Sequence, residues 1–587
     1  MTSRPTLLVV LISLAALAVG TAATPLWDED EARFAAIART MVETGDWIVP
    51  RFNGTLAVDK PVLMHWCMAA CMSVFGINEF AARLPSMFAT LATALALLRA
   101  GRRWCDDTTG IVAALAYVGC LLVAIESHAA TPDAILTALT AWATILLAEG
   151  IMPGADGMLR RPSLASSVIA GLLLGLAVVC KGPIGFVGPM AVLGPWAWWL
   201  AAERRAAPVS RDATTPWMSR MLRAAVPSAI EATVALRPVV VLLATLAAAA
   251  PWYVAVTLQT DGAWTSGFFY VHNVGRFMAP MEQHSGNAAY HPLVMLVGFY
   301  PWSCFLPFAL VVAIWRLVRH TVSGTTAHAL LLTLAWLAVW VGGFSAAATK
   351  LPNYVLPAYP AAALLMAIMA VDAVHRAARS GHWIHPRWMA AGLGWLIFGG
   401  VATAATIVIG ARYGLPGAEP AAIVGLVPVI GAVVCGVEAR RRPATALAAF
   451  TATGIVYAAL AVGPAQQRIA VANTLPSLVR TVEALPDTTA PIGTYLLASP
   501  NIVFYADRPV TQIGDGDIDG ITRFLTSDAD AVLLVPEDHY ESIARALPPG
   551  CGVVNRARPV FRQHDIVAVG RLSAPHRTAT IDEETRR

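Results

Sequence analysis

The sequence predicts an all-α membrane domain of about thirteen transmembrane helices, followed by a small soluble α/β domain. Hydrophobic residues make up 57% of its 587 residues, and the mean hydropathy of +0.61 is above that of soluble domains. Apolar runs of about 17–25 residues, the length that crosses a bilayer as a helix, recur through residues 1–464. Residues 465–587 carry short strand-like and helix-like runs instead.

The apolar runs predict the positions of the membrane spans. Residues 7–23 are long enough to span, and no convincing cleavage site precedes the acidic residues that follow, so this run is predicted to be a helix and not a signal peptide. The further predicted spans lie near residues 79–98, 109–126, 132–150, 165–180, 183–202, 236–258, 289–315, 327–345, 353–373, 388–410, 420–437 and 443–463.

Basic residues predict the orientation of these spans. Lys and Arg collect in loops on the cytoplasmic side of a membrane. With the N-terminus inside, every second loop should be basic, and arginine clusters do fall in those loops: Arg99, Arg102, Arg103, Arg160, Arg161, Arg204, Arg205, Arg211, Arg220, Arg223, Arg316, Arg319, Arg376, Arg379, Arg387 and residues 440–442. An odd number of spans then places the C-terminus outside.

Charge and cysteine content exclude other classes. The net charge is only +4, and the loops account for the basic residues, so no nucleic-acid partner is predicted. The eight cysteines lie mostly in apolar runs, and Cys551 is alone in the tail, so the sequence predicts no disulfide framework.

The tail is predicted to be a soluble α/β domain outside the membrane. The runs "APIGTYLL", "DAVLLVP" and "HDIVAVGRL" have strand character, whereas "GITRFLTS" and "YESIARAL" have helix character. The last dozen residues, rich in Thr, Glu and Arg, predict disorder.

Polar clusters collect in the predicted outer loops, of which residues 24–78 and 259–288 are the largest. Lys181, Arg276 and Lys350 lie close to the membrane on the side where basic residues are disfavoured. Each alone is consistent with a structural ion pair to a nearby carboxylate. Together they predict a pocket for an anionic lipid headgroup such as a phosphate.

Four consecutive acids, residues 28–31, follow the first span. Asp28 and Glu31 have the spacing of a capping box, which gives both a structural task. Asp30 falls in the first helical turn, where backbone N–H groups favour its charge, and no local partner explains it. An amphipathic helix on the membrane surface is predicted from the apolar residues Phe34, Ile37, Ala38 and Met41.

Asp133 is the second acid without an evident partner. It begins the fourth predicted span, directly after Pro132. One explanation of an acid at this position is that its negative charge stabilises the start of the helix. If Asp30 and Asp133 approach one external cavity, the pair resembles the carboxylates used in glycosyl transfer, one activating or orienting a nucleophile and one stabilising charge at the sugar.

Six segments carry a resemblance to a known family: "DEARFAAIARTMVETGDWIVPRFNG", "DKPVLMHW", "FGINEFAARLPS", "CKGPIGF", "HNVGRF" and "TKLPNYVLPAYPA". In this order they resemble the GT-C polyprenyl-phosphate-sugar glycosyltransferases, and specifically the lipid A aminoarabinose transferases. The resemblance implies a GT-C fold in the bacterial cytoplasmic (inner) membrane. It also implies transfer of a sugar from undecaprenyl phosphate to lipid A or a similar envelope glycolipid, with inversion, on the periplasmic side.

The resemblance also assigns residues. It implies that Asp30 and Asp133 are catalytic, and that Lys60 of "DKP" binds substrate. It further implies that the "TKLPNY" segment contributes Lys350 and Tyr354 to substrate binding.

A metal site is a further possibility. Several relatives have Glu where this chain has Asp59, which is one methylene shorter. Asp59 could join His272 and His284 around a divalent metal, zinc or magnesium, although their loose spacing favours ordinary hydrogen-bonding histidines.

Two other functions remain as alternatives. Protein O-mannosylation would use the same type of donor with a Ser or Thr acceptor, and Asp30 would then act as a general base. A flippase for lipid-linked sugars would need polar residues at mid-membrane depth and on both faces. The predicted spans are apolar and the polar clusters lie on one side, which disfavours transport.

Overall fold

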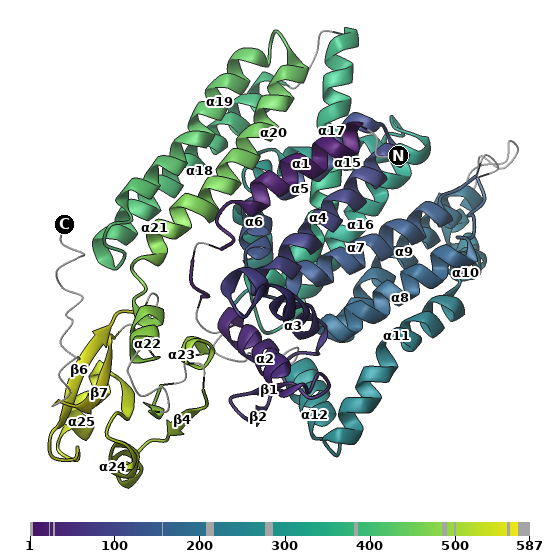
Figure 1. The fold of residues 1–587 in the computed structure, drawn as a ribbon. Coiled ribbons are helices and arrows are strands. Elements are labelled where there is room, and N and C mark those ends of the chain that lie inside the picture. The colour runs from purple at the N-terminus through teal and green to yellow at the C-terminus, as the bar shows by residue number, and fades with distance from the viewer. Residues whose placement is uncertain are drawn as a thin grey trace, which may run out of the picture.

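The computed structural model describes residues 4–22, 24–27, 30–154, 157–206, 217–275, 286–380, 385–483, 490–497, 500–506, 508–559 and 564–572. Helices dominate residues 4–470, and a small sheet follows them near the C-terminus (Figure 1). The predicted fold class, a helical membrane protein with a C-terminal α/β region, is confirmed.

Ten helices among the described residues are long and apolar enough to cross a membrane, and the bent pair of α5 and α6 could supply an eleventh crossing. The ten are α4 (Glu79–Trp104), α7 (Asp133–Ile151), α8 (Leu164–Lys181), α9 (Ile184–Ala206), α11 (Pro238–Gln259), α16 (Gly324–Ala346), α17 (Tyr359–Ser380) with η3 (Pro352–Ala358), α18 (Pro386–Tyr413), α19 (Leu426–Glu438) with η4 (Glu419–Gly425), and α20 (Pro443–Leu460) with η5 (Ala461–Ala465) and α21 (Gln466–Ala470). The bent pair joins α5 (Asp107–Val118) to α6 (Leu121–Ser127) at 66°.

Two of the predicted spans take shorter forms. The run at 7–23 forms α1 (Arg4–Ala18), which has only 15 residues. The run at 289–315 is divided into α14 (Tyr290–Gly298), η2 (Trp302–Cys304) and α15 (Leu306–Val318). Pro301 interrupts it, since proline lacks the N–H that a helix interior requires. The count of about thirteen crossings therefore stays a prediction.

Small residues let the membrane helices approach closely. A Cβ built on Gly101 of α4 would lie 2.5 Å from the Cα of Gly110 in α5, and one on Gly171 of α8 would lie 2.6 Å from the Val241 carbonyl oxygen in α11. Both contacts are closer than any side chain tolerates. Such small residues are the usual means of packing helices in lipid, where hydrophobic burial contributes little.

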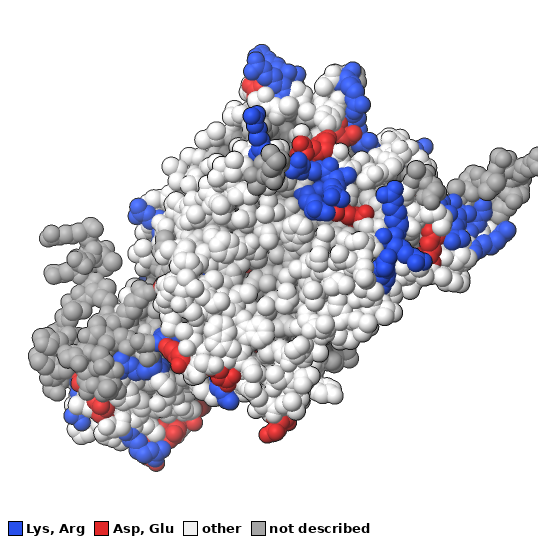
Figure 2. All heavy atoms as spheres, turned by 45° about the vertical axis from the view of Figure 1, so that its right-hand side comes forward, with Lys and Arg blue, Asp and Glu red and all other residues white. Residues whose placement is uncertain are grey.

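Charged side chains lie mainly at the two ends of the molecule. Figure 2 shows Lys and Arg gathered at the upper end, and a broad flank below it with few charges. The N-terminus is at this upper end, while the C-terminal sheet lies at the lower end (Figure 1). The uncharged flank is the surface expected to contact lipid tails.

Residues 30–75 lie at the lower end of the molecule and are named the polar layer. They form α2 (Asp30–Thr44), β1 (Arg51–Phe52), β2 (Thr55–Leu56) and α3 (Leu63–Phe75). The apolar face of α2 packs against α3 and α23 (Pro500–Tyr505). The prediction that this face lies on the membrane is wrong, because protein covers it. Its four predicted residues are at most 2% exposed: Phe34, Ile37, Ala38 and Met41.

The C-terminal region is a five-stranded sheet with the strand order β4-β3-β5-β7-β6. β3 (Ile492–Tyr495) pairs in parallel with β4 (Val510–Ile513) and β5 (Val532–Pro536), whereas β7 (Ile566–Arg571) is antiparallel to β5 and β6 (Cys551–Ala557). Its helices are α22 (Leu475–Glu483), α23, α24 (Ile518–Ser527) and α25 (Glu537–Ala544). The sequence predicted β3, β5, β7, α24 and α25. The residues predicted to be disordered lie outside the described part of the chain.

Hydrogen bonds fasten this sheet region to the polar layer. The Asn53 side chain makes two bonds with the backbone of Val510, at 2.8 and 3.0 Å. The Tyr505 hydroxyl accepts from the backbone N–H of Leu26 and donates to Glu79, both at 2.9 Å. The C-terminal region is therefore in direct contact with the segment that leads into α2.

Candidate functional site

Three predicted site residues, Asp133, Lys181 and Tyr354, meet in the structure. The Lys181 ammonium donates to Oδ1 of Asp133, and the two side chains are 12% and 2% exposed. Asn353 donates to Oδ2 of the same carboxylate at 3.1 Å. The Lys181 nitrogen also lies 4.9 Å from the ring centroid of Tyr354, within range of a cation–π contact.

Local structure places this pair at opposite helix ends. Asp133 is the first residue of α7, where the helix dipole favours a negative charge, and Lys181 is the last residue of α8, where it favours a positive one. Gly182 ends α8 with φ +82°, a conformation that glycine adopts without strain. The pair is thus stabilised by both helices and by its own contact.

Glu126 is a buried acid beside this pair that the sequence analysis did not select. Its carboxylate accepts a bond of 2.8 Å from the Thr131 hydroxyl and is 7% exposed. It interacts electrostatically with Asp133, Lys181 and Asp30, so it lies near both predicted catalytic acids. An acid within an apolar helical run was the available signal.

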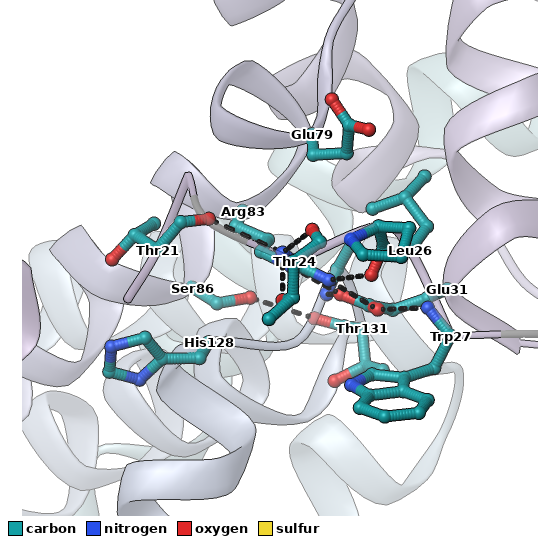
Figure 3. Close-up of polar contacts among 12 residues, drawn as sticks. Thr21, Thr24, Leu26, Trp27, Glu31, Glu79, Arg83, Ser86, His128 and Thr131 are labelled. Carbon is teal, nitrogen blue, oxygen red and sulfur yellow. Dashed lines mark hydrogen bonds and ion pairs between the residues drawn. The ribbon is translucent and has the colours of Figure 1, made fainter. Parts of the chain in front are cut away.

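Glu31, next to Asp30, forms a buried ion pair with Arg83 (Figure 3). Arg83 Nε and Nη2 donate to the two carboxylate oxygens at 2.8 and 2.9 Å, and the side chains are 1% and 4% exposed. The same carboxylate accepts 2.8 Å bonds from the backbone N–H groups of Trp27 and Ala130. Glu31 reaches back to the N–H of Trp27, one residue before the predicted cap Asp28, and it also joins α2 to α4 and to the loop before α7.

Asp30 itself is exposed at the first position of α2. No described residue forms a hydrogen bond or ion pair with its carboxylate. Asp28, the predicted cap, lies outside the described residues. Asp30 is thus an accessible carboxylate on a helix whose start is held rigidly by Glu31.

Asp59 and Lys60 lie beside α2. The Asp59 carboxylate pairs with Arg33 at 3.4 Å, and the Lys60 ammonium lies 5.9 Å from the Phe34 ring centroid. Burial raises the pKa of Asp59, but the nearby charges of Lys60, Arg33 and His65 outweigh this effect and hold the pKa below its usual value. Asp59 is therefore an ionised carboxylate with two cationic neighbours.

The remaining predicted residues are placed differently or lie outside the described residues. Lys350 is 4% exposed and donates to the carbonyl oxygens of Phe344 at 3.1 Å and Ser345 at 2.6 Å, near the end of α16. Arg276 and His284 are not among the described residues. His272 lies in the π-helical segment η1 (Gly267–Gly275).

A metal site made by Asp59, His272 and His284 stays a prediction, since His284 is not described. Within the described ranges, no group of three or more His, Cys, Asp or Glu side chains is arranged to hold a metal ion.

Comparison with known proteins agrees with this architecture. Residues 59–226 match the family described as dolichyl-phosphate-mannose-protein mannosyltransferase. An undecaprenyl phosphate-alpha-4-amino-4-deoxy-L-arabinose arabinosyl transferase of Enterobacter sp. (strain 638) is 29% identical over 393 residues, which are 66% of this chain and 62% of that protein. The enzyme of the same name from Pseudomonas aeruginosa (strain UCBPP-PA14) is 31% identical over 342 residues, 58% of this chain and 55% of that protein. The matched part of the chain thus spans about three fifths of the length of these relatives.

Two solved structures share the fold over nearly the whole chain. ArnT from Cupriavidus metallidurans bound to undecaprenyl phosphate has a TM-score of 0.76 and 19% sequence identity, covering 96% of this chain and 97% of that one. The apo state of the same protein has a TM-score of 0.73 with the same coverage. The chain is therefore a multi-pass membrane protein that shares the fold of ArnT and resembles, in its sequence, the GT-C glycosyltransferases of the aminoarabinose transferase type.

Proposed function

We propose that this protein is an inverting glycosyltransferase that moves a sugar from undecaprenyl phosphate to a phosphate of lipid A or to a similar envelope glycolipid. The names of the relatives and the undecaprenyl phosphate bound to ArnT support this choice of donor. The observation that carries the proposal is the buried contact of Lys181 with Asp133, flanked by Asn353 and Tyr354. A buried cation near helix ends is a suitable partner for a lipid phosphate.

In this proposal the cations bind the donor phosphate. Lys181 exchanges part of its contact with Asp133 for a phosphate oxygen, and Asn353 keeps the carboxylate in place. Lys60 approaches from the polar layer, and Arg276 remains a predicted ligand of the phosphate. Lys350, at the end of α16, adds positive charge from within the bundle. Cations held in a region of low dielectric stabilise the charge that develops on a departing phosphate.

The transfer step exchanges one carbon–oxygen bond for another. An oxygen of the acceptor phosphate attacks the anomeric carbon from the side opposite the carrier, and the bond from that carbon to the carrier phosphate breaks. The acceptor changes from phosphomonoester to phosphodiester while the carrier does the reverse, so no proton transfer is needed. Asp30 then stabilises positive charge at the anomeric carbon or orients the donor; with a hydroxyl acceptor it would take the proton.

The proposed orientation puts this chemistry on the periplasmic side of the bacterial cytoplasmic membrane. The arginine-rich loops face the cytoplasm together with the N-terminus, in line with the preference of basic loops for that side. α2 and the C-terminal region, residues 465–587, then face the periplasm. Residues 1–464 form the transferase domain.

The test is transfer by the purified protein in detergent. Undecaprenyl phosphate carrying 4-amino-4-deoxy-L-arabinose is supplied with lipid A, and the product is identified by mass spectrometry. Modified lipid A is expected with the wild-type protein, and at least about 100-fold less with Asp30→Asn. Mannosylation of a Ser- or Thr-containing peptide from a mannose donor, with lipid A unchanged, would contradict the proposal in favour of protein O-mannosylation.

A further inference from the structure

A cavity of about 260 Å³ lies between α15, α17, α18, α19 and α20, away from α2 and the C-terminal sheet. Its walls are almost entirely apolar and aromatic, and they include Trp302, Phe305, Met369, Trp388, Leu393 and Phe450. An apolar cavity of this kind excludes water and accepts hydrocarbon. This part of the molecule is not used by the proposed transfer reaction.

The cavity adjoins a wider and more polar one. Met389 and Leu393 line both this cavity and a neighbouring one of about 760 Å³, so the two meet at α18. The larger cavity is lined by the exposed arginines at 440–442, which connect α19 to α20. Together the two cavities form an apolar recess that opens beside a cluster of positive charge.

The remaining charges at the opening do not cancel this cluster. Arg376 reaches the apolar cavity and pairs with Asp372 at 3.1 Å, and the same carboxylate also pairs with Arg316 at 2.6 Å. The guanidinium groups of Arg316 and Arg376 thus share the single negative charge of Asp372. Glu438, the last residue of α19, is the acid nearest in sequence to the arginines at 440–442.

The opening also has the composition of a membrane interface. Trp388 is 36% exposed, and its ring stacks on Phe308 with 5.3 Å between centroids and 23° between planes. Tryptophan is enriched at the depth of the lipid headgroups. The start of α18 and the connection between α19 and α20 lie at the upper end in Figure 1, the end where Lys and Arg gather in Figure 2.

We infer that this recess binds an anionic glycerophospholipid, with one acyl chain in the apolar cavity and the phosphate beside the arginines at 440–442. Charge complementarity selects this occupant, because a zwitterionic lipid would leave the three arginines without a net negative partner. The inferred lipid belongs to the leaflet at the arginine-rich end, and its binding does not depend on the proposed transfer activity.

The test is native mass spectrometry of the full-length protein in detergent with added phosphatidylglycerol or phosphatidylcholine. Phosphatidylglycerol is expected to bind more tightly. The variant R440Q/R441Q/R442Q is expected to lose at least about tenfold in affinity, since each Arg near a lipid headgroup contributes roughly 1 kcal/mol. The variant R160Q/R161Q/R223Q removes three exposed arginines elsewhere, two just before α8 and one in the helix at 217–236, and is expected to bind as the wild type does.

A second variant tests the apolar part of the recess. Ala370 lines the cavity and is half-buried, so Ala370→Phe fills it without removing charge. It should lower the affinity for phosphatidylglycerol while leaving the thermal midpoint close to that of the wild type. Equal loss in the two arginine variants, or no preference between the two lipids, would overturn the inference. So would undecaprenyl phosphate displacing phosphatidylglycerol, since the recess would then bind the carrier.

Discussion

The carboxylate of Glu31 accepts a 2.8 Å hydrogen bond from the backbone N–H of Ala130. Glu31 follows Asp30 at the start of α2, and Ala130 lies shortly before Asp133 at the start of α7. The bond therefore ties together the two segments that carry the proposed catalytic acids. Arg83 neutralises the Glu31 charge, which is why a carboxylate can occupy so buried a position.

Glu31→Gln should destabilise the protein strongly. Gln keeps the shape but leaves the buried Arg83 guanidinium without its anion, which costs on the order of 3–5 kcal/mol. Glu43→Gln is the matched control on the same helix, because Glu43 is 46% exposed in its pair with Arg39 and such a pair contributes at most about 1 kcal/mol. The thermal midpoints of the purified variants provide the measurement. Equal midpoints for both would mean that the buried pair does not hold α2 in place.

Asp30→Asn should abolish most of the transfer activity and leave the fold intact. The side chain is exposed and no described residue pairs with it, so the substitution removes only its charge. Loss of a catalytic carboxylate lowers turnover by about 100-fold or more. Asp261→Asn removes an exposed acid from a turn outside α2 and serves as the control. Unchanged turnover in Asp30→Asn, measured with the lipid A assay, would remove Asp30 from the proposed mechanism.

Lys181→Met should weaken binding of undecaprenyl phosphate and also destabilise the fold, because Asp133 loses its buried partner. The double variant Asp133→Asn/Lys181→Met removes both charges and should recover much of the stability, but not the affinity. Thermal midpoints and the affinity for undecaprenyl phosphate separate the two effects. A double variant that binds the carrier like the wild type would show that Lys181 has only a structural role.

The stability of the polar layer should fall with acid through His65. Burial lowers the pKa of His65 to about 4, although Asp59 opposes the shift. In the unfolded chain this imidazole has its ordinary pKa of 6.5. Between pH 6.5 and about pH 4 the unfolded state therefore binds a proton that the folded state does not, and this proton binding stabilises the unfolded state. The thermal midpoint should therefore drop between about pH 6.5 and about pH 4. His65→Asn, which retains a donor for the Phe34 carbonyl oxygen, should show a shallower drop. Parallel profiles would exclude His65 as the cause.

Tyr505→Phe should loosen the C-terminal region from the polar layer. Phenylalanine cannot bond to the Leu26 N–H or to Glu79, and loss of the bond to the buried Leu26 N–H costs about 1–3 kcal/mol. Limited proteolysis is expected to release the C-terminal region faster than in the wild type. Tyr540→Phe, within that region, is the control. Identical cleavage rates for both variants would show that Tyr505 does not hold the interface.

Several parts of the candidate site could be predicted from local sequence. Asp133 follows a proline at a helix start, and Lys181 precedes "GP" at a helix end; such positions next to apolar runs already mark charges held at the membrane boundary. Tyr354 was predicted only through the family resemblance. None of this indicates which charge pairs with which, and the direct contact between Lys181 and Asp133 was not foreseen.

Hydropathy, periodicity and loop charge determined by themselves that the chain is a helical membrane protein with a C-terminal α/β region, since these properties depend on neighbours along the chain. Tertiary structure alone decided that Glu31 pairs with Arg83, 52 positions away, that Glu126 lies beside Asp133, and that protein covers the apolar face of α2. Burial is the physical reason. A charge inside a helical bundle must find an opposite charge or a hydrogen bond, and the partner is whichever group the packed helices bring within reach.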